Sequence, residues 1–259
     1  MVGRWADLQA EAVRIVTEAG EAGVTLRVVG SAGIRLHCNY PRQFMDLLDR
    51  PAKDIDFVVP EKHRKGMRRY LEARGYMVDR DLLIAMEGTR YSFRHAELGT
   101  DIDVFVERLS FCHTIEVKDR LNRHPVTLPI EELLLQKLQI VNQTVTDVMD
   151  AAVILASHPV TNSGGDLEQI DGGHVARILA RDWGFHHTAT TNLKRITEAV
   201  GEDNGIDLGQ QANRQVHDGV VTLLSAIDAE PKSRSWRIRS RIGERKQWWQ
   251  DVDDKEATY

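Results

Sequence analysis

Two aspartates, Asp54 and Asp56, begin an apolar run that ends at Val59. On a β-strand, residues two positions apart leave by the same face, so these two carboxylates would lie side by side and repel unless a cation lies between them. Mg²⁺ suits such a pair, because it takes one or two protein carboxylates and completes its shell with water and substrate phosphates. The pair therefore indicates a metal and phosphate site, although Asp-x-Asp alone is a common pattern.

A Gly-Ser turn precedes this pair. The apolar run from Leu26 to Val29 stops at Gly30-Ser31, and a helical pattern follows. Backbone N–H groups and a hydroxyl would then lie at a helix N-terminus, where anions bind. The turn predicts a seat for phosphate groups, with an ordinary helix N-cap as the alternative.

A third carboxylate lies within the apolar run 101–106. Asp103 would be costly there as an unpaired charge, so we expect a cation beside it. Asp101 shares its strand face, and either residue could be the third ligand of a metal site.

Together, these motifs resemble the pattern of the DNA polymerase beta-like nucleotidyltransferase superfamily. A later helical segment resembles the signature of its AbiEii-type toxin branch and that branch's uncharacterised bacterial relatives. Toxin-branch members often carry Ser or Thr where this chain has Ala52, which is a departure. The likeness covers about residues 24–156, and the later segment 231–249 also resembles the ending of those relatives. It is carried by Gly30-Ser31, Lys53-Asp54-Ile55-Asp56, Asp103-Val104-Phe105, and the segment 128–141 with Asp147 and Asp150 behind it.

The resemblance implies a mixed sheet with flanking helices that binds two Mg²⁺ ions and a nucleoside triphosphate. Asp54 and Asp56 would hold the nucleotide-bound metal, and Asp103, which fits the family pattern better than Asp101, would complete the second site. The second metal would lower the pKa of an acceptor hydroxyl and aim it at the α-phosphorus, with Asp103 as a possible proton acceptor. Gly30-Ser31 would donate to the β- and γ-phosphates.

Lys137 is a further candidate catalytic residue. It interrupts the apolar face of its helix, where a lysine ordinarily extends to water. A lysine at this place is functional in the toxin branch, which implies a phosphate or metal-carboxylate partner across the cleft. Asp147 is either a helix N-cap or part of this group, and Asp150 is a candidate partner of Lys137.

Lys53, together with Arg42 and Arg50, could neutralise triphosphate charge, with a solvated loop as the equal alternative. Four histidines have no pattern that brings them to the carboxylates. We therefore expect surface or loop positions for them: His113, His124, His186 and His187.

The elements that must position these residues differ between the two halves of the chain. Alternating apolar patterns and glycines predict an α+β domain over residues 1–118, and helical periodicity predicts an all-helical domain over 119–259. In the first domain the expected helices are 6–22, 31–38 and 61–74, and the expected strands are 26–29, 55–59, 76–78, 82–86, 91–95 and 102–106. In the second the expected helices begin at 130 and 147 and then cover 174–184, 187–200 and 211–229.

The segment 232–246 contains seven basic residues, one acid and Trp236, and Trp248 and Trp249 follow it. One interpretation is a surface that grips RNA phosphates and stacks bases. The alternative, which we favour from the sequence, is an amphipathic helix that packs Ile238, Ile242 and Trp249 against the body of the protein.

The whole chain has 259 residues and a formal net charge of -5, which gives no general attraction to nucleic acid or anionic membrane. It contains no apolar run of about 20 residues and no signal-peptide pattern, so we expect a cytoplasmic protein without a membrane partner. Its two cysteines are too few for a disulfide framework.

The sequence therefore predicts a Mg²⁺-dependent nucleotidyltransferase that moves a nucleoside monophosphate from an NTP, such as ATP, to an unidentified acceptor. By analogy with the toxin branch, we expect tRNA or a protein as the acceptor. The same analogy implies that the chain acts as a toxin and has an antitoxin partner. Two alternatives stay open: a kinase-like phosphoryl transferase on the same fold, and a catalytically silent nucleotide- or partner-binding module.

Overall fold

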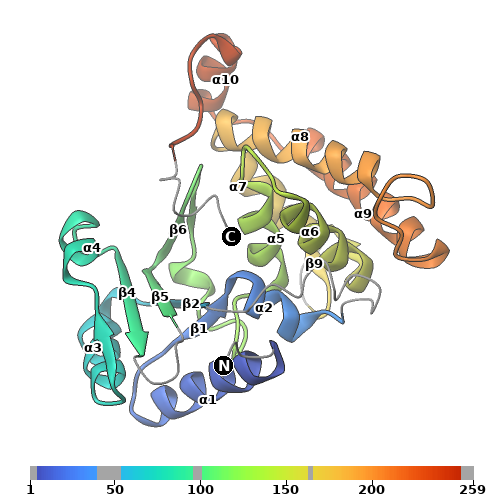
Figure 1. The fold of residues 1–259 in the computed structure, drawn as a ribbon. Helices are drawn as coiled ribbons and strands as arrows, with labels where there is room; N and C mark the ends of the chain where they lie inside the picture. The colour runs from blue at the N-terminus through green and yellow to red at the C-terminus, as the bar shows by residue number, and fades with distance from the viewer. Residues whose placement is uncertain (1–4, 40–53, 96–100, 163–165, 252–259) are drawn as a thin grey trace. The chain divides into compact units, whose positions relative to one another are not determined.

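The structure is a computed structural model that describes residues 5–39, 54–95, 101–162 and 166–251. The chain divides into two compact units (Figure 1). The first consists of Met1–Leu109 and Ile115–Pro129, and the second of Ser110–Thr114 and Ile130–Tyr259. The predicted boundary at residue 118 thus falls inside the first unit.

The first unit contains a mixed five-stranded sheet in the order β1-β2-β5-β4-β3. Strands β2 and β5 pair in parallel, and the other neighbours are antiparallel. The mixed α+β character expected from the sequence is confirmed. The strands are β1 (Arg27–Val29), β2 (Asp54–Val59), β3 (Tyr76–Val78), β4 (Arg90–His95) and β5 (Asp101–Val106).

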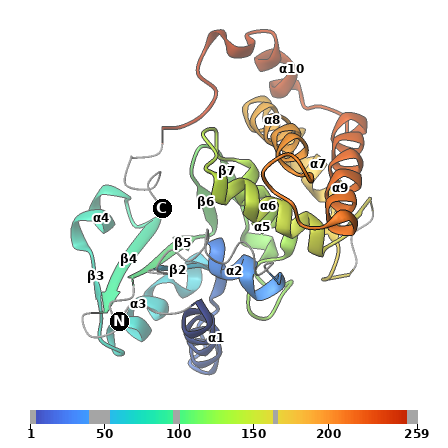
Figure 2. The same ribbon diagram turned by 45° about the vertical axis from the view of Figure 1, so that its right-hand side comes forward.

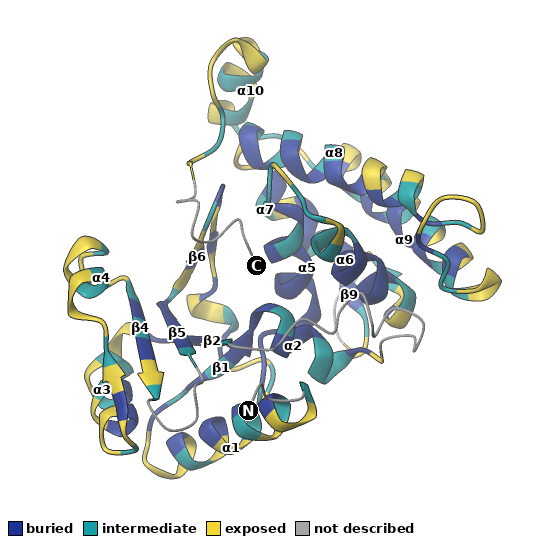
Figure 3. Ribbon diagram, viewed as in Figure 1, coloured by how far each residue is buried: buried dark blue, intermediate teal, exposed yellow. Residues whose placement is uncertain are grey.

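One face of this sheet forms the core of the first unit (Figure 3). Ile55, Phe57 and Val59 alternate along β2 and are fully buried, together with α1 (Trp5–Glu21) and α3 (Arg64–Glu72) side chains such as Ile15 and Leu71. Burial of each such side chain contributes roughly 1.5–3 kcal/mol. Because strand residues alternate, Asp54 and Asp56 leave by the opposite face of β2.

The predicted strand at 82–86 is wrong. These residues belong to α4 (Arg80–Ala85), which begins where Asp79 Oδ1 accepts a hydrogen bond from Leu82 N at 3.0 Å. An Asp N-cap can start a helix in an apolar stretch that is too short for periodicity to distinguish helix from strand. The remaining short elements of this part of the chain are α2 (Gly30–His37), η2 (Glu61–His63), β6 (Arg108–Ser110), β7 (Thr114–Glu116) and η3 (Lys118–Arg120).

The second unit is mainly helical (Figure 2). Its central helix is α5 (Ile130–Leu138), in which every residue but Lys137 is buried. α5 contacts α6 (Val145–Ser157), α7 (Gly172–Leu179) and α8 (Trp183–Ala199). The expectation of an all-helical second half is wrong in one detail, because β8 (Val160–Thr161) and β9 (Ile170–Asp171) pair in parallel. The unit continues with α9 (Gln210–Ala229), α10 (Arg234–Ser240) and η4 (Gly243–Arg245).

Within the described ranges, no helix is both long and apolar enough to span a bilayer.

Candidate functional site

Four aspartates form a compact array on the first unit's sheet. In the parallel pairing of β2 with β5, Asp54 lies opposite Asp101 and Asp56 lies opposite Asp103. All four are partly exposed, whereas the residues that alternate with them are buried in the core. The register therefore brings the predicted third carboxylate, Asp103, directly beside Asp56, and brings its rival Asp101 beside Asp54.

The Gly-Ser turn lies against this array. Val29, the last residue of β1, pairs with Asp56. Gly30, the next residue and the first of α2, therefore lies beside that aspartate. Gly30 has φ +65°, and a Cβ atom added to it would lie 2.2 Å from Asp56 Oδ2. Only glycine fits this position, for its backbone angle and for the close approach of the carboxylate. Gly30 and Ser31 lie inside the first turn of α2, whose N-cap is Val29.

Two arginines on β4 engage the carboxylates of β5. Arg90 Nη2 lies 2.7 Å from Asp103 Oδ2, and both side chains are less than one-fifth exposed. Arg94 donates two hydrogen bonds to Asp101, of 2.8 Å from Nε and 2.9 Å from Nη2. The cation expected beside Asp103 is thus present as Arg90. Sequence reasoning missed it, although the alternation of Arg90, Ser92 and Arg94 was a signal for one polar face of β4.

The donor set fits a Mg²⁺ ion at Asp54 and Asp56, because this metal needs only one or two carboxylates and takes its other ligands from water and phosphate. In the part of the chain that the structure describes, no group of three His, Cys, Asp or Glu side chains gathers closely enough to hold a metal ion by itself. Lys53, Ala52, Arg42 and Arg50 lie outside the described residues.

Lys137 belongs to a separate ion cluster in the second unit. Its Nζ lies 2.8 Å from Asp150 Oδ2 and 3.1 Å from Asp147 Oδ1, and its side chain is only 12% exposed. Burial alone would lower the pKa of Lys137, but the two aspartates outweigh burial and raise that pKa above its ordinary value. The expected pairing of Asp150 with Lys137 is confirmed, and the predicted partner across a cleft stays a prediction.

Asp147 is not the N-cap of α6. Thr144 takes that position, and Asp147 completes a capping box, in which Asp147 Oδ2 accepts from Thr144 N at 3.0 Å and Thr144 Oγ1 accepts from Asp147 N at 3.2 Å. Burial would raise the pKa of Asp147, but the charge of Lys137 and the Thr144 hydrogen bonds bring it below its ordinary value. Asp147 therefore links the helix start to the ion cluster.

Two of the four histidines, His113 and His124, lie in loops as expected, whereas His186 and His187 lie within a helix. His113 is buried and its Nε2 lies 2.9 Å from Thr188 Oγ1; burial lowers its pKa to about 4. His186 and His187 are partly buried within α8, and burial lowers the pKa of His186 to about 4 as well. His124 is also partly buried, and its Nδ1 accepts from Thr127 N at 2.9 Å.

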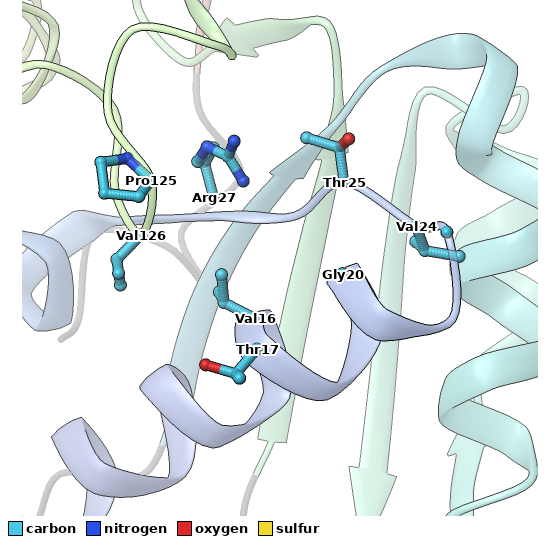
Figure 4. A pocket seen from close by; sticks show the side chains of 9 residues that line it. Val16, Thr17, Gly20, Val24, Thr25, Arg27, Pro125 and Val126 are labelled. Atoms are coloured by element: carbon cyan, nitrogen blue, oxygen red, sulfur yellow. The ribbon is translucent and has the colours of Figure 1, made fainter.

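A pocket of about 490 Å³ lies in the first unit, beside the start of β1 (Figure 4). Val16 and Thr17 of α1 line one side, and Arg27 and Pro125 lie across from them. Arg27 Nη1 donates to Leu26 O at 2.7 Å, and burial lowers the pKa of this guanidinium. The lining contains one cation and two threonines but no carboxylate, so this pocket lacks the carboxylate donors of the β2–β5 array.

The packing interpretation of the C-terminal segment is wrong for its two isoleucines. Ile238 and Ile242, which it assigned to the body of the protein, are 64% and 42% exposed. Trp248 does pack, since its Nε1 donates to Thr188 Oγ1 at 3.1 Å. A pocket of about 480 Å³ lies beside Trp248 and Trp249.

A comparison with protein-family models and a comparison with curated proteins both find no match to this chain.

Proposed function

We propose that this chain is a Mg²⁺-dependent nucleotidyltransferase whose first unit is a polymerase-beta-like domain. The observation that carries the proposal is the close approach of Gly30 to Asp56 within the β2–β5 carboxylate array. It combines paired carboxylates on one face of the sheet with a glycine turn at a helix start. The likeness of the same residues to the DNA polymerase beta-like superfamily supports it.

In this proposal Asp54 and Asp56 would hold Mg²⁺, which would neutralise triphosphate charge and make the α-phosphorus more electrophilic. The acceptor hydroxyl forms the new bond to the α-phosphorus, and pyrophosphate is the leaving group. The N–H groups of Gly30 and Ser31 bind the β- and γ-phosphates of the NTP, because the N-terminus of α2 carries a partial positive charge. Asp103, as the third carboxylate, completes a second Mg²⁺ site and accepts the proton of the acceptor hydroxyl.

Two basic residues have supporting roles in the proposal. Arg90 fixes the orientation of Asp103 through the 2.7 Å ion pair, so that one carboxylate oxygen keeps a constant position on the sheet. Lys53 neutralises charge on the triphosphate. Lys137, held by Asp147 and Asp150, is the remaining proposed catalytic residue, and its present contacts are those of a helix-joining ion cluster.

The test is incubation of the purified chain with Mg²⁺ and each α-labelled NTP, with total RNA and protein extract as acceptors. Asp54→Asn and Asp56→Asn should each lower label transfer on the order of a hundredfold or more, as expected for loss of charge stabilisation at the reacting phosphate. Asp81→Asn is the matched control, because it makes the same chemical change at an exposed carboxylate of the first unit. The fraction that takes up the label, RNA or protein, identifies the class of acceptor.

Two results would overturn the proposal. One is unchanged transfer by Asp56→Asn; the other is label that enters an acceptor from γ-labelled but not α-labelled NTP, which would mean phosphoryl transfer. A comparison of Asp103→Asn with Asp101→Asn separates the two candidates for the third ligand. Loss of transfer in Asp101→Asn alone would exchange their roles.

A further inference from the structure

The C-terminal segment presents an uncompensated basic surface. Five of its cationic side chains are exposed, and in the described parts of the chain none of them forms an ion pair. Glu230, Glu244 and Asp251 are the acids nearest in sequence. Local charge is thus positive on a chain whose net charge is -5. The exposed cations are Arg234, Arg237, Arg241, Arg245 and Lys246.

Aromatic side chains adjoin this surface. Trp248 and Trp249 line the pocket of about 480 Å³ together with Lys246 and Arg239. This volume is within the usual range for small-molecule sites, roughly 300–1,000 Å³. Both tryptophans are partly exposed, and their ring centroids lie 4.7 Å apart. The pocket therefore offers indole surface next to a positive charge.

Specific contacts hold the segment in this conformation. Arg239 donates to Gly243 O at 2.7 Å and to Lys246 O at 2.6 Å, and its guanidinium lies 4.8 Å from the centroid of the Trp183 ring. Gln250 N donates to Cys112 O at 2.9 Å. One arginine is thus used to fix the fold of the segment, while the other arginines stay available. The surface is preorganised, which lowers the entropy that binding would cost.

We propose that this surface binds single-stranded nucleic acid. Arginine forks match phosphate geometry, and bases stack on aromatic side chains in a largely sequence-independent way. Arg237 and Arg241 are four residues apart on a helical turn, so their Cα atoms are separated by about 6 Å along the axis. That separation is comparable to the step between phosphates of an extended strand. Bases of the same strand would stack in the Trp248 and Trp249 pocket.

An acidic peptide could also pair with the arginines, and an anionic membrane could accept Ile238 and Ile242. An acidic peptide has no ring to stack in the tryptophan pocket, and a membrane takes up side chains that project from the surface, whereas Trp248 and Trp249 are partly buried around a pocket. Single-stranded nucleic acid matches both the exposed cations, with its phosphates, and the tryptophan pocket, with its bases. The inference goes beyond nucleotidyl transfer, because binding is measured without NTP or Mg²⁺ and each proposal can fail alone.

The experiment measures fluorescence anisotropy of a labelled single-stranded RNA of mixed sequence with the full chain at several salt concentrations. The variant Arg237→Ala/Arg241→Ala/Arg245→Ala removes three phosphate contacts, which should reduce the slope of log K against log salt by about 2. Binding by the unmodified chain should therefore weaken roughly 20-fold more than binding by the variant between 50 and 200 mM salt.

The matched control is Lys62→Ala/Lys65→Ala/Arg69→Ala, which removes the same charge from exposed positions of the first unit. It should bind as the unmodified chain does. Trp249→Ala should weaken binding without a change of slope. Equal losses in the two triple variants, or tighter binding of a polyglutamate peptide or of phosphatidylglycerol vesicles than of RNA, would overturn the proposal.

Discussion

Substitution of Gly30 by alanine tests the central geometry of the candidate site. The left-handed backbone at φ +65° costs an alanine about 1–2 kcal/mol, which the lower entropy of the unfolded chain offsets by about 0.4–1 kcal/mol. The new Cβ would also meet Asp56 Oδ2 at 2.2 Å, so the carboxylate must move. Such overpacking costs about 1–3 kcal/mol, and we expect a total loss of about 2–4 kcal/mol.

Gly23 provides the matched control. It has φ +75°, but nothing lies within 4 Å of a Cβ at that position. Gly23→Ala should therefore show the backbone cost alone, roughly 1 kcal/mol or less. The difference between the two substitutions isolates the contact with Asp56.

Urea unfolding followed by far-UV circular dichroism measures both losses. The substitution Asp56→Ala removes Oδ2 and Cγ, so that the nearest atom left to a Cβ at position 30 is the Cβ of residue 56, at 3.3 Å. In this background Gly30→Ala should therefore lower the free energy of unfolding about as much as Gly23→Ala does. If Gly30→Ala and Gly23→Ala destabilise equally in the unmodified chain, the close approach is wrong. Nucleotidyl transfer by Gly30→Ala should also fall, because the substitution displaces Asp56.

Two further predictions concern the second unit. Asp150→Asn should lower the free energy of unfolding by about 3 kcal/mol, measured in urea, because it leaves Lys137 buried with one carboxylate partner. Lys137→Met should cost at least as much, because it leaves the buried carboxylates of Asp147 and Asp150 without their cation. The unfolding free energy should also fall as pH decreases from 6.5 to 4: His113 has a folded pKa of about 4 and an ordinary pKa of 6.5, so the unfolded chain binds more protons in this window. Protonation of His113 accounts for a loss of at most about 3 kcal/mol of unfolding free energy. His113→Gln should reduce the difference in unfolding free energy between pH 7 and pH 5, measured in urea. An unchanged difference would contradict this prediction.

Local patterns predicted the elements that carry the candidate site. Alternation in 54–59 and 101–106 predicted β2 and β5, and the glycine after an apolar run predicted the start of α2. Arg90 was not predicted as the partner of Asp103, because that contact depends on the order and register of β4 and β5, which no local pattern contains.

In the C-terminal segment the sequence predicted burial that the structure does not have. The spacing of Ile238 and Ile242 correctly indicated helical structure near α10, but the same spacing cannot say whether another element covers that face. In α5, by contrast, even polar residues are buried: Glu132 is fully buried, and its Oε1 lies 2.8 Å from His174 Nε2. Burial of a polar helix face follows from the surrounding helices.

The parallel pairing of β2 with β5 has a consequence for folding. Asp56 and Asp103 are neighbours in the sheet, although α3, β3, α4 and β4 all come between them in sequence. Closing a long loop costs entropy before the contacts that repay it can form, so this pairing should appear late as the first unit folds. A nascent chain released before β5 would have the Gly30 turn and the first two aspartates, but it would lack the strand that brings Asp103 beside them.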